Sequence, residues 1–141
     1  MYLIFVFLWR CMLTNSFIQT YKDKSIPFGG NGLGNFVYLR TYSRWLEDAM
    51  RRESWPETVR RVVDYSLQLY QGPATQEQLR TEAEFMFDSM YNLRVFPAGR
   101  TLWIGGTKAA EEFGSANFNC AFVVMNSLSA FVDTFHLLNQ K

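Results

Sequence analysis

Two stretches in the middle of the chain repeat apolar residues three or four positions apart, which is helical spacing. The first occupies residues 55–70 and is ended by Gly72-Pro73, and the second occupies residues 76–91. Each is preceded by a capping box, Ser54-Trp55-Pro56-Glu57 and Thr75-Gln76-Glu77-Gln78, in which the hydroxyl and the acid or amide side chain satisfy backbone N–H groups. The pattern predicts two helices that pack as an antiparallel pair.

The regions around this pair predict shorter elements. Short helices are expected at residues 16–21 and 108–113, and a last helix is expected after Asn126-Ser127. Residues 25–36 contain four glycines and predict a loop, and residues 93–107 mix turn residues with large apolar ones, which indicates an ordered loop across a core. The glycines follow neither the dinucleotide-binding nor the P-loop spacing, so a nucleotide-cradling role is disfavoured.

The segment Asn117–Met125 is short, mostly apolar and rich in β-prone residues. Such a run is typical of a strand buried on both faces, as in a parallel sheet or barrel. A single strand and one helix cannot complete such a sheet, so we expect an unfinished α/β unit at residues 116–141, after a helical region at residues 16–115.

The first 15 residues form an apolar extension of doubtful status. Met1–Trp9 is too short to span a membrane, lacks a preceding positive charge and has no small-residue cleavage site after it. An artefactual extension or a buried strand is preferred over a secretory or anchoring role, so no membrane partner is predicted.

Composition narrows the class of protein. The 141 residues are 48% hydrophobic with a net charge of +1, which fits a globular chain and provides no overall basic field for nucleic acid. Cys11 and Cys120 are too few for a disulfide framework or a zinc site, so a reducing cytoplasmic compartment is the expectation.

Two groups of residues could carry chemistry. Arg40 and Arg44 alternate with Tyr42 and Trp45, a pattern that can bind single-stranded nucleic acid, but neighbouring acidic residues favour a solvated face with the aromatic rings turned inward.

Cys120 lies within the predicted strand, where it is either a small apolar residue or a redox or nucleophilic thiol that needs a partner. His136 lies about four helical turns further on and is no obvious base for it.

Four segments in order resemble one enzyme family: FVYLRTYSRW from Phe36, RRESWPETVRRVVDYSLQLY from Arg51, FPAGRTLWIGGT from Phe96 and ANFNCAFV from Ala116. They are similar to the N-terminal region of the monomeric, adenosylcobalamin-dependent ribonucleoside-triphosphate reductases. The resemblance covers the chain from about residue 16 to its end.

The resemblance implies a ten-stranded α/β barrel for the complete protein, of which this mainly helical chain would hold a helical layer and the first strand and helix. It also implies thiyl-radical reduction of ribonucleoside triphosphates to 2′-deoxyribonucleoside triphosphates, with adenosylcobalamin as cofactor, a thioredoxin-like dithiol as reductant and a deoxynucleotide effector. The radical cysteine and the cobalamin-binding region lie downstream in the family. We therefore expect this chain alone to be inactive.

The resemblance also assigns roles to single residues. Cys120 matches the first cysteine of the redox-active pair, whose partner is absent from this chain. Asn119 would lie beside the substrate sugar, and Thr101 is a weaker candidate for a phosphate contact. His136 receives no role. The alternative is a non-catalytic helical interaction module derived from a reductase N-terminus.

Overall fold

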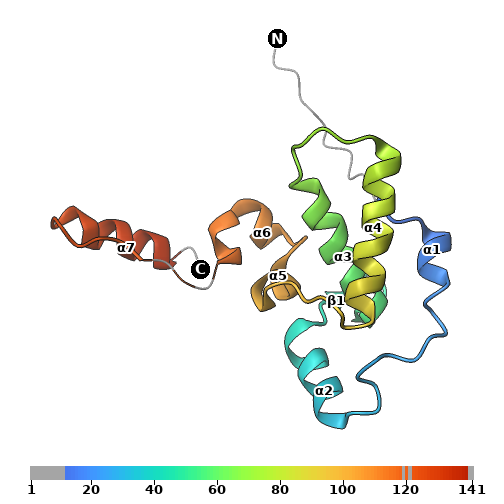
Figure 1. The fold of residues 1–141 in the computed structure, drawn as a ribbon. Coiled ribbons are helices and arrows are strands. Elements are labelled where there is room, and N and C mark those ends of the chain that lie inside the picture. The colour runs from blue at the N-terminus through green and yellow to red at the C-terminus, as the bar shows by residue number, and fades with distance from the viewer. Residues whose placement is uncertain (1–11, 119, 121, 140–141) are drawn as a thin grey trace.

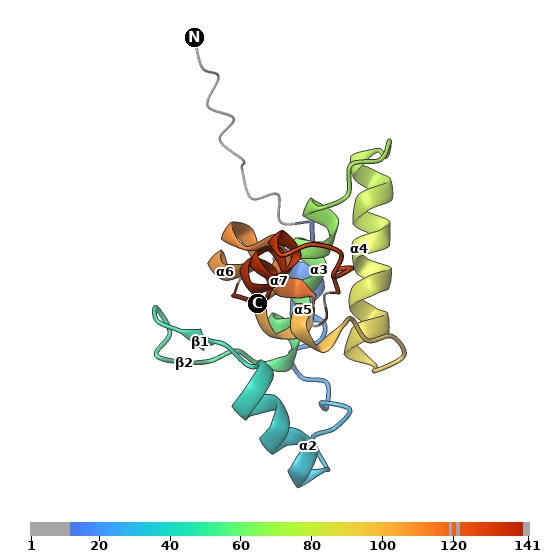
Figure 2. The same cartoon turned by 90° about the vertical axis from the view of Figure 1, so that its left-hand side faces the viewer.

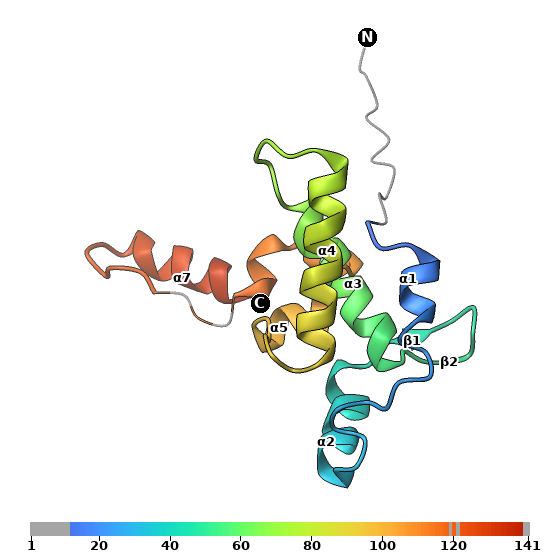
Figure 3. The same ribbon diagram turned by 45° about the vertical axis from the view of Figure 1, so that its right-hand side comes forward.

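Two antiparallel helices lie at the centre of the computed structural model, which describes residues 12–118, 120 and 122–139. Helix α3 (Trp55–Gln68) and helix α4 (Gln76–Tyr91) lie side by side in every view (Figures 1 and 3). Both capping boxes are present: Oε2 of Glu57 accepts from the Ser54 N–H at 2.7 Å, and Oγ1 of Thr75 accepts from the Gln78 N–H at 3.2 Å. The two helices predicted from the sequence are therefore confirmed.

The core lies where the apolar faces of α3 and α4 meet. Val59, Val63 and Phe87 are fully buried, and the Trp55 indole N–H donates to the Tyr91 carbonyl at 3.1 Å, which joins the start of α3 to the end of α4. Burying apolar surface in this way is the main favourable contribution to folding. The pair therefore forms the scaffold on which the other elements pack.

The N-terminal segment packs against this scaffold. Leu13 is fully buried in the same core, and α1 (Asn15–Gln19) follows it, as the sequence predicted for this region. The Tyr21 ring makes edge contacts with Phe87 at 4.9 Å and Tyr91 at 4.8 Å between ring centroids. The last residues of the apolar extension thus belong to the folded unit.

Short helices replace parts of the two predicted loops. Helix α2 (Gly32–Val37) runs directly into a π-helical turn, η1 (Tyr38–Tyr42), and α5 (Gly99–Ile104) lies within residues 93–107. Helix α2 begins because Oδ1 of Asn31 accepts from two amide N–H groups of its first turn, a local cap that the glycine content conceals. Helix α6 (Lys108–Glu112) occupies the predicted position, and a 3₁₀ turn, η2 (Gly114–Asn117), follows it.

A two-stranded hairpin projects from the helical body beside α2 (Figure 2). Strand β1 (Trp45–Leu46) pairs antiparallel with β2 (Arg51–Arg52), so that Trp45 lies opposite Arg52. The turn between them contains Met50 at φ +49°. This hairpin is the only sheet in the part of the chain that the structure describes.

The strand that the sequence predicted at Asn117–Met125 is not observed, so that prediction is wrong. The described residues of this segment after η2, which are 118, 120 and 122–125, form no strand, and Phe122 is 90% exposed. A strand needs a hydrogen-bonded neighbour, and no other strand lies against this segment in the described chain. The predicted last helix is confirmed as α7 (Ser129–Asn139), which extends away from the helical pair (Figure 1).

Candidate functional site

Cys120 lies in the irregular segment between η2 and α7. It is an exposed free thiol, and its described neighbours Phe118, Phe122 and Val124 are also exposed. The sequence predicted a buried position for this cysteine, and that prediction is wrong for the chain as it stands because the strand that would bury it does not form. An exposed thiol is accessible to a dithiol reductant.

The other predicted site residues are not gathered around Cys120. Asn119 and Cys11 lie outside the described residues. Thr101 lies on α5, where its carbonyl accepts from the Gly105 N–H at 2.8 Å, and no hydrogen bond among described residues joins it to Cys120. His136 is exposed on α7.

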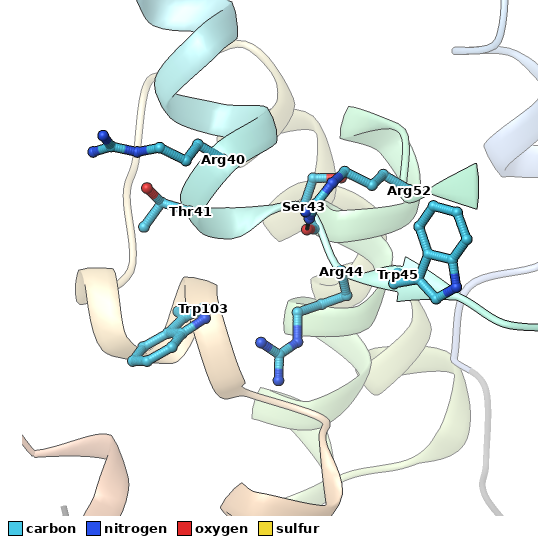
Figure 4. A pocket seen from close by; sticks show the side chains of 7 residues that line it. All are labelled: Arg40, Thr41, Ser43, Arg44, Trp45, Arg52 and Trp103. Carbon is cyan, nitrogen blue, oxygen red and sulfur yellow. Dashed lines mark hydrogen bonds between the residues drawn. The ribbon is translucent and has the colours of Figure 1, made fainter. Parts of the chain in front are cut away.

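A pocket that the sequence did not predict lies between the hairpin, the end of η1 and α5 (Figure 4). Its volume is about 380 Å³. We call it the arginine pocket, and its lining includes Arg40, Ser43, Arg44, Trp45, Arg52 and Trp103.

The wall of the arginine pocket is built on Ser43, a buried residue between η1 and β1. Its hydroxyl donates to the Glu53 carbonyl at 2.7 Å, and its own carbonyl accepts from the Arg52 guanidinium at 2.8 Å. Tyr38 donates to the same Glu53 carbonyl at 3.1 Å, and burial raises the pKa of this tyrosine to about 12. These bonds fix the backbone from which Arg44 and Arg52 project.

A buried ion pair lies behind this wall. Arg61 on α3 donates to the Glu53 carboxylate through Nε at 2.8 Å and a terminal nitrogen at 3.0 Å, and both side chains are nearly excluded from solvent. Arg61 also donates to the carbonyls of Gly105 at 2.5 Å and Leu102 at 3.3 Å. It therefore ties the hairpin base to α5, the two elements that face each other across the arginine pocket.

The close approach of Arg61 to α5 depends on a glycine. Gly106 has φ +71°, and a Cβ atom there would lie 2.9 Å from Cγ of Arg61. The left-handed backbone and the lack of space both require glycine at this position. The Gly105-Gly106 pair thus permits the contact between α3 and α5.

The arginine pocket is rich in positive charge. Burial lowers the pKa of the Arg44 guanidinium, the neighbouring charge of Arg61 lowers it further, and Glu53 opposes both effects. Among the described residues, no ion pair joins Arg40, Arg44 or Arg52 to a carboxylate. Such a constellation suits an anionic ligand.

The alternating arginines and aromatics of residues 40–52 gave the only sequence signal for this pocket. Tyr42 packs against the core as predicted, but Trp45 is 49% exposed, so the prediction that the aromatics turn inward is wrong for Trp45. The hairpin reverses the chain after Trp45 and places its indole outside the core. Trp103 comes from a distant part of the sequence, which is why no local pattern linked it to these arginines.

Neither a metal site nor a bilayer-spanning helix occurs in the described part of the chain. No group of three His, Cys, Asp or Glu side chains there could hold a metal ion. None of the described helices has the length and apolar character needed to cross a bilayer.

Comparison with known proteins identifies similar chains. The sequence model of the ribonucleotide reductase alpha domain family matches residues 13–107 of this chain. Adenosylcobalamin-dependent ribonucleoside-triphosphate reductases from Levilactobacillus brevis and Lacticaseibacillus paracasei are 39% and 40% identical over 120 residues, which cover 80% of this chain and 16% of each relative. The crystal structure of a B12-dependent (class II) ribonucleotide reductase matches with a TM-score of 0.65 and 35% identity, over 77% of this chain and 16% of that one. The chain thus spans about a sixth of the length of these relatives.

Proposed function

The chain belongs to the ribonucleotide reductase alpha-domain family, and we propose that it forms the N-terminal region of an adenosylcobalamin-dependent ribonucleoside-triphosphate reductase. The observation that carries this proposal is the 35% identical match to a solved class II reductase together with its TM-score of 0.65. The complete enzyme would convert ribonucleoside triphosphates to 2′-deoxyribonucleoside triphosphates by thiyl-radical chemistry. The remaining barrel, the radical cysteine and the effector site would come from sequence beyond this chain.

In this proposal Cys120 supplies half of the reducing equivalents. Its thiol and that of a second cysteine from outside the chain form a disulfide and release two electrons and two protons. The substrate accepts both and loses its 2′ hydroxyl as water, and a thioredoxin-like dithiol then reduces the disulfide by thiol–disulfide exchange. Cys120 is a free thiol in this structure, so it is available for a disulfide with a cysteine from outside the chain. Asn119 and Thr101 remain proposed contacts to the sugar and the phosphate.

The described residues do not fit the cobalamin itself. The arginine pocket has a volume of about 380 Å³, towards the lower end of the range for small ligands, and its charged lining suits an anion better than a corrin ring. When bound in the complete enzyme, adenosylcobalamin would supply the initiating radical.

The exposed apolar surface after η2 supports the proposal that further sequence covers this end. Besides Phe122, Leu128 is 86% exposed and Phe135 is 70% exposed, although apolar side chains of this size are normally covered. In the complete enzyme, neighbouring barrel strands would pair with residues 117–125 and bury one end of this surface. The strand expected from the sequence would then form only in that context.

A chimera tests this function. The matching N-terminal region of the Levilactobacillus brevis reductase would be replaced by this chain, and formation of deoxyribonucleotide would be measured with adenosylcobalamin, effector and a dithiol reductant. We expect multiple turnovers, and we expect Cys120→Ser to abolish them. Cys11→Ser is the matched control and should leave turnover unchanged.

Two outcomes would contradict the proposal. A folded chimera without activity would favour the non-catalytic interaction module. Full turnover by the Cys120→Ser chimera would remove the redox role of this cysteine while leaving the family assignment intact.

A further inference from the structure

A hydrogen bond joins the segment that carries Cys120 to the helical scaffold. Nδ2 of Asn117, the last residue of η2, donates to the hydroxyl oxygen of Tyr65 on α3 at 2.8 Å. Tyr65 is only 7% exposed, so the bond reaches from this segment into the interior of the protein. We propose that Asn117 and Tyr65 are positioning residues that hold Cys120 in place for its redox step. This inference rests on the proposed function and adds to it the contact that places the thiol.

The hydrogen bond lies beside a small second core. Tyr65 packs there with Ile104, Ala110 and Ala116, so that α3, α5, α6 and η2 each contribute one buried residue. Ala116 brings the chain to this core, and Asn117 follows it directly. A hydrogen bond shielded by apolar surface is electrostatically stronger than one in water. The end of η2 is therefore fixed to α3 both by packing and by a hydrogen bond.

The surroundings of Asn117 determine the orientation of its amide. Nδ2 also lies 3.4 Å from the Gly114 carbonyl oxygen, so turning the amide over would place its oxygen against another acceptor. Oδ1 is buried and has no hydrogen-bond partner among the described residues. An unpaired buried acceptor costs free energy, so stability alone does not account for an asparagine at this position.

Asn117 lies close enough to Cys120 to control its position. Three residues of extended chain span at most about 11 Å, which limits the distance of the cysteine from the end of η2. After Asn117, the hydrogen bonds among the described residues join positions no more than four apart. The bond to Tyr65 is thus the last one to the scaffold before the cysteine in the described chain. Because displacing a reacting group by about 1 Å can slow a reaction about a hundredfold, such an anchor affects the rate.

A nitroxide label on Cys120 of the 141-residue chain, with Cys11→Ser to leave one thiol, tests the anchor itself. Tyr65→Phe removes the acceptor oxygen and keeps the ring that packs in the second core. In Tyr65→Phe and in Asn117→Leu we expect a more mobile label, seen as narrower lines in the electron paramagnetic resonance spectrum. The combined variant should show no further change, because both substitutions remove the same bond. Tyr70→Phe is the matched control at a 51% exposed tyrosine and should leave the spectrum unchanged.

Turnover by the Levilactobacillus brevis chimera tests the effect on the redox step. Tyr65→Phe and Asn117→Leu should each lower kcat about tenfold or more. The KM for ribonucleoside triphosphate should change by less than about threefold, because binding is shared among many contacts whereas the rate depends on the placement of one sulfur atom. Tyr70→Phe should leave both constants unchanged. Circular dichroism would confirm that every variant is folded, and Tyr65→Phe alone decides if Asn117→Leu does not fold.

The outcomes separate this inference from the proposed function. Unchanged kcat in Tyr65→Phe of an active chimera, or an unchanged spectrum of the labelled Tyr65→Phe chain, would overturn the positioning role and leave the redox role of Cys120 intact. An equal loss of kcat in Tyr70→Phe would also overturn it. A folded but inactive unmodified chimera would overturn the proposed function, and the positioning role would fall with it.

Discussion

The buried pair of Glu53 and Arg61 should contribute strongly to stability, and Glu53→Gln tests this. The substitution keeps the shape of the side chain but removes its charge, and it leaves the Arg61 guanidinium uncompensated at a position where its side chain is 12% exposed. Removing one partner of a buried ion pair lowers the free energy of unfolding by about 3–5 kcal/mol. Because Arg61 keeps the carbonyls of Gly105 and Leu102 as acceptors, we expect the lower end, about 3 kcal/mol.

Urea unfolding followed by circular dichroism at 222 nm measures the effect. With an m-value of about 2 kcal/mol per M, the midpoint should fall by about 1.5 M. Glu84→Gln is the control, because it removes a carboxylate from an exposed pair with Arg80 and should cost about 0.5 kcal/mol or less. Equal losses in the two variants would refute the reasoning that burial makes the inner pair matter.

A double-mutant cycle separates the pair from its surroundings. Arg61→Met removes the other charge, so the combined variant no longer contains an unpaired buried ion. Residues in direct contact show coupling of about 0.5–3 kcal/mol, and we expect the double variant to be at least about 1 kcal/mol more stable than additivity predicts. Additive losses would show that the two charges act independently.

Three further predictions concern the helical scaffold and use the same urea assay. Phe87→Ala should lower the free energy of unfolding by about 3–5 kcal/mol because the ring is fully buried. Phe85→Ala, at a 64% exposed position on the same helix, should lower it by less than about 0.5 kcal/mol. Equal losses would contradict the assignment of Phe87 to the core face of α4. Thr75→Ala should lower the free energy of unfolding by about 1 kcal/mol because it removes the N-terminal cap of α4. Thr81→Ala, within the same helix, should not cause this loss. An unchanged stability of Thr75→Ala would argue against the capping box. Hydrogen bonds from Arg51 hold the pKa of Glu57 at about 2, below the ordinary 4.5, so its stabilisation is complete above pH 4.5 and is lost as pH falls toward 2. The contribution of Glu57 to stability is modest because its side chain is 35% exposed to solvent. Glu57→Gln should reduce the loss of stability on acidification, and an unchanged pH profile of stability would contradict the role of this carboxylate.

Local signals allowed the central helices to be predicted from the sequence. The capping boxes at Ser54 and Thr75 and the helical spacing of apolar residues act within a few positions, so they are visible without knowledge of the fold. The strand at Asn117–Met125 was wrong for the opposite reason. A β-prone apolar run specifies what could pair, but the pairing strand must come from elsewhere, and none lies against it in the described chain.

The candidate site was predictable only in part. The cysteine was found because its sequence context resembles that of a known family, and the structure adds that it is exposed. The arginine pocket was missed because it joins the hairpin to Trp103 on α5, more than 50 residues apart in the chain, through contacts organised by Arg61. Non-local contacts of this kind leave no periodic pattern in a single sequence.

The central claim is that Cys120 becomes oxidised as a ribonucleotide is reduced, and peptide mapping after one turnover tests it most directly. The reduced chimera would be incubated with ribonucleoside triphosphate and adenosylcobalamin without an external dithiol, alkylated, digested and analysed by mass spectrometry. We predict that Cys120 is recovered in a disulfide with a cysteine of the reductase barrel, in an amount equal to the deoxyribonucleotide formed. Product formation with Cys120 still fully alkylated as a thiol would contradict the account.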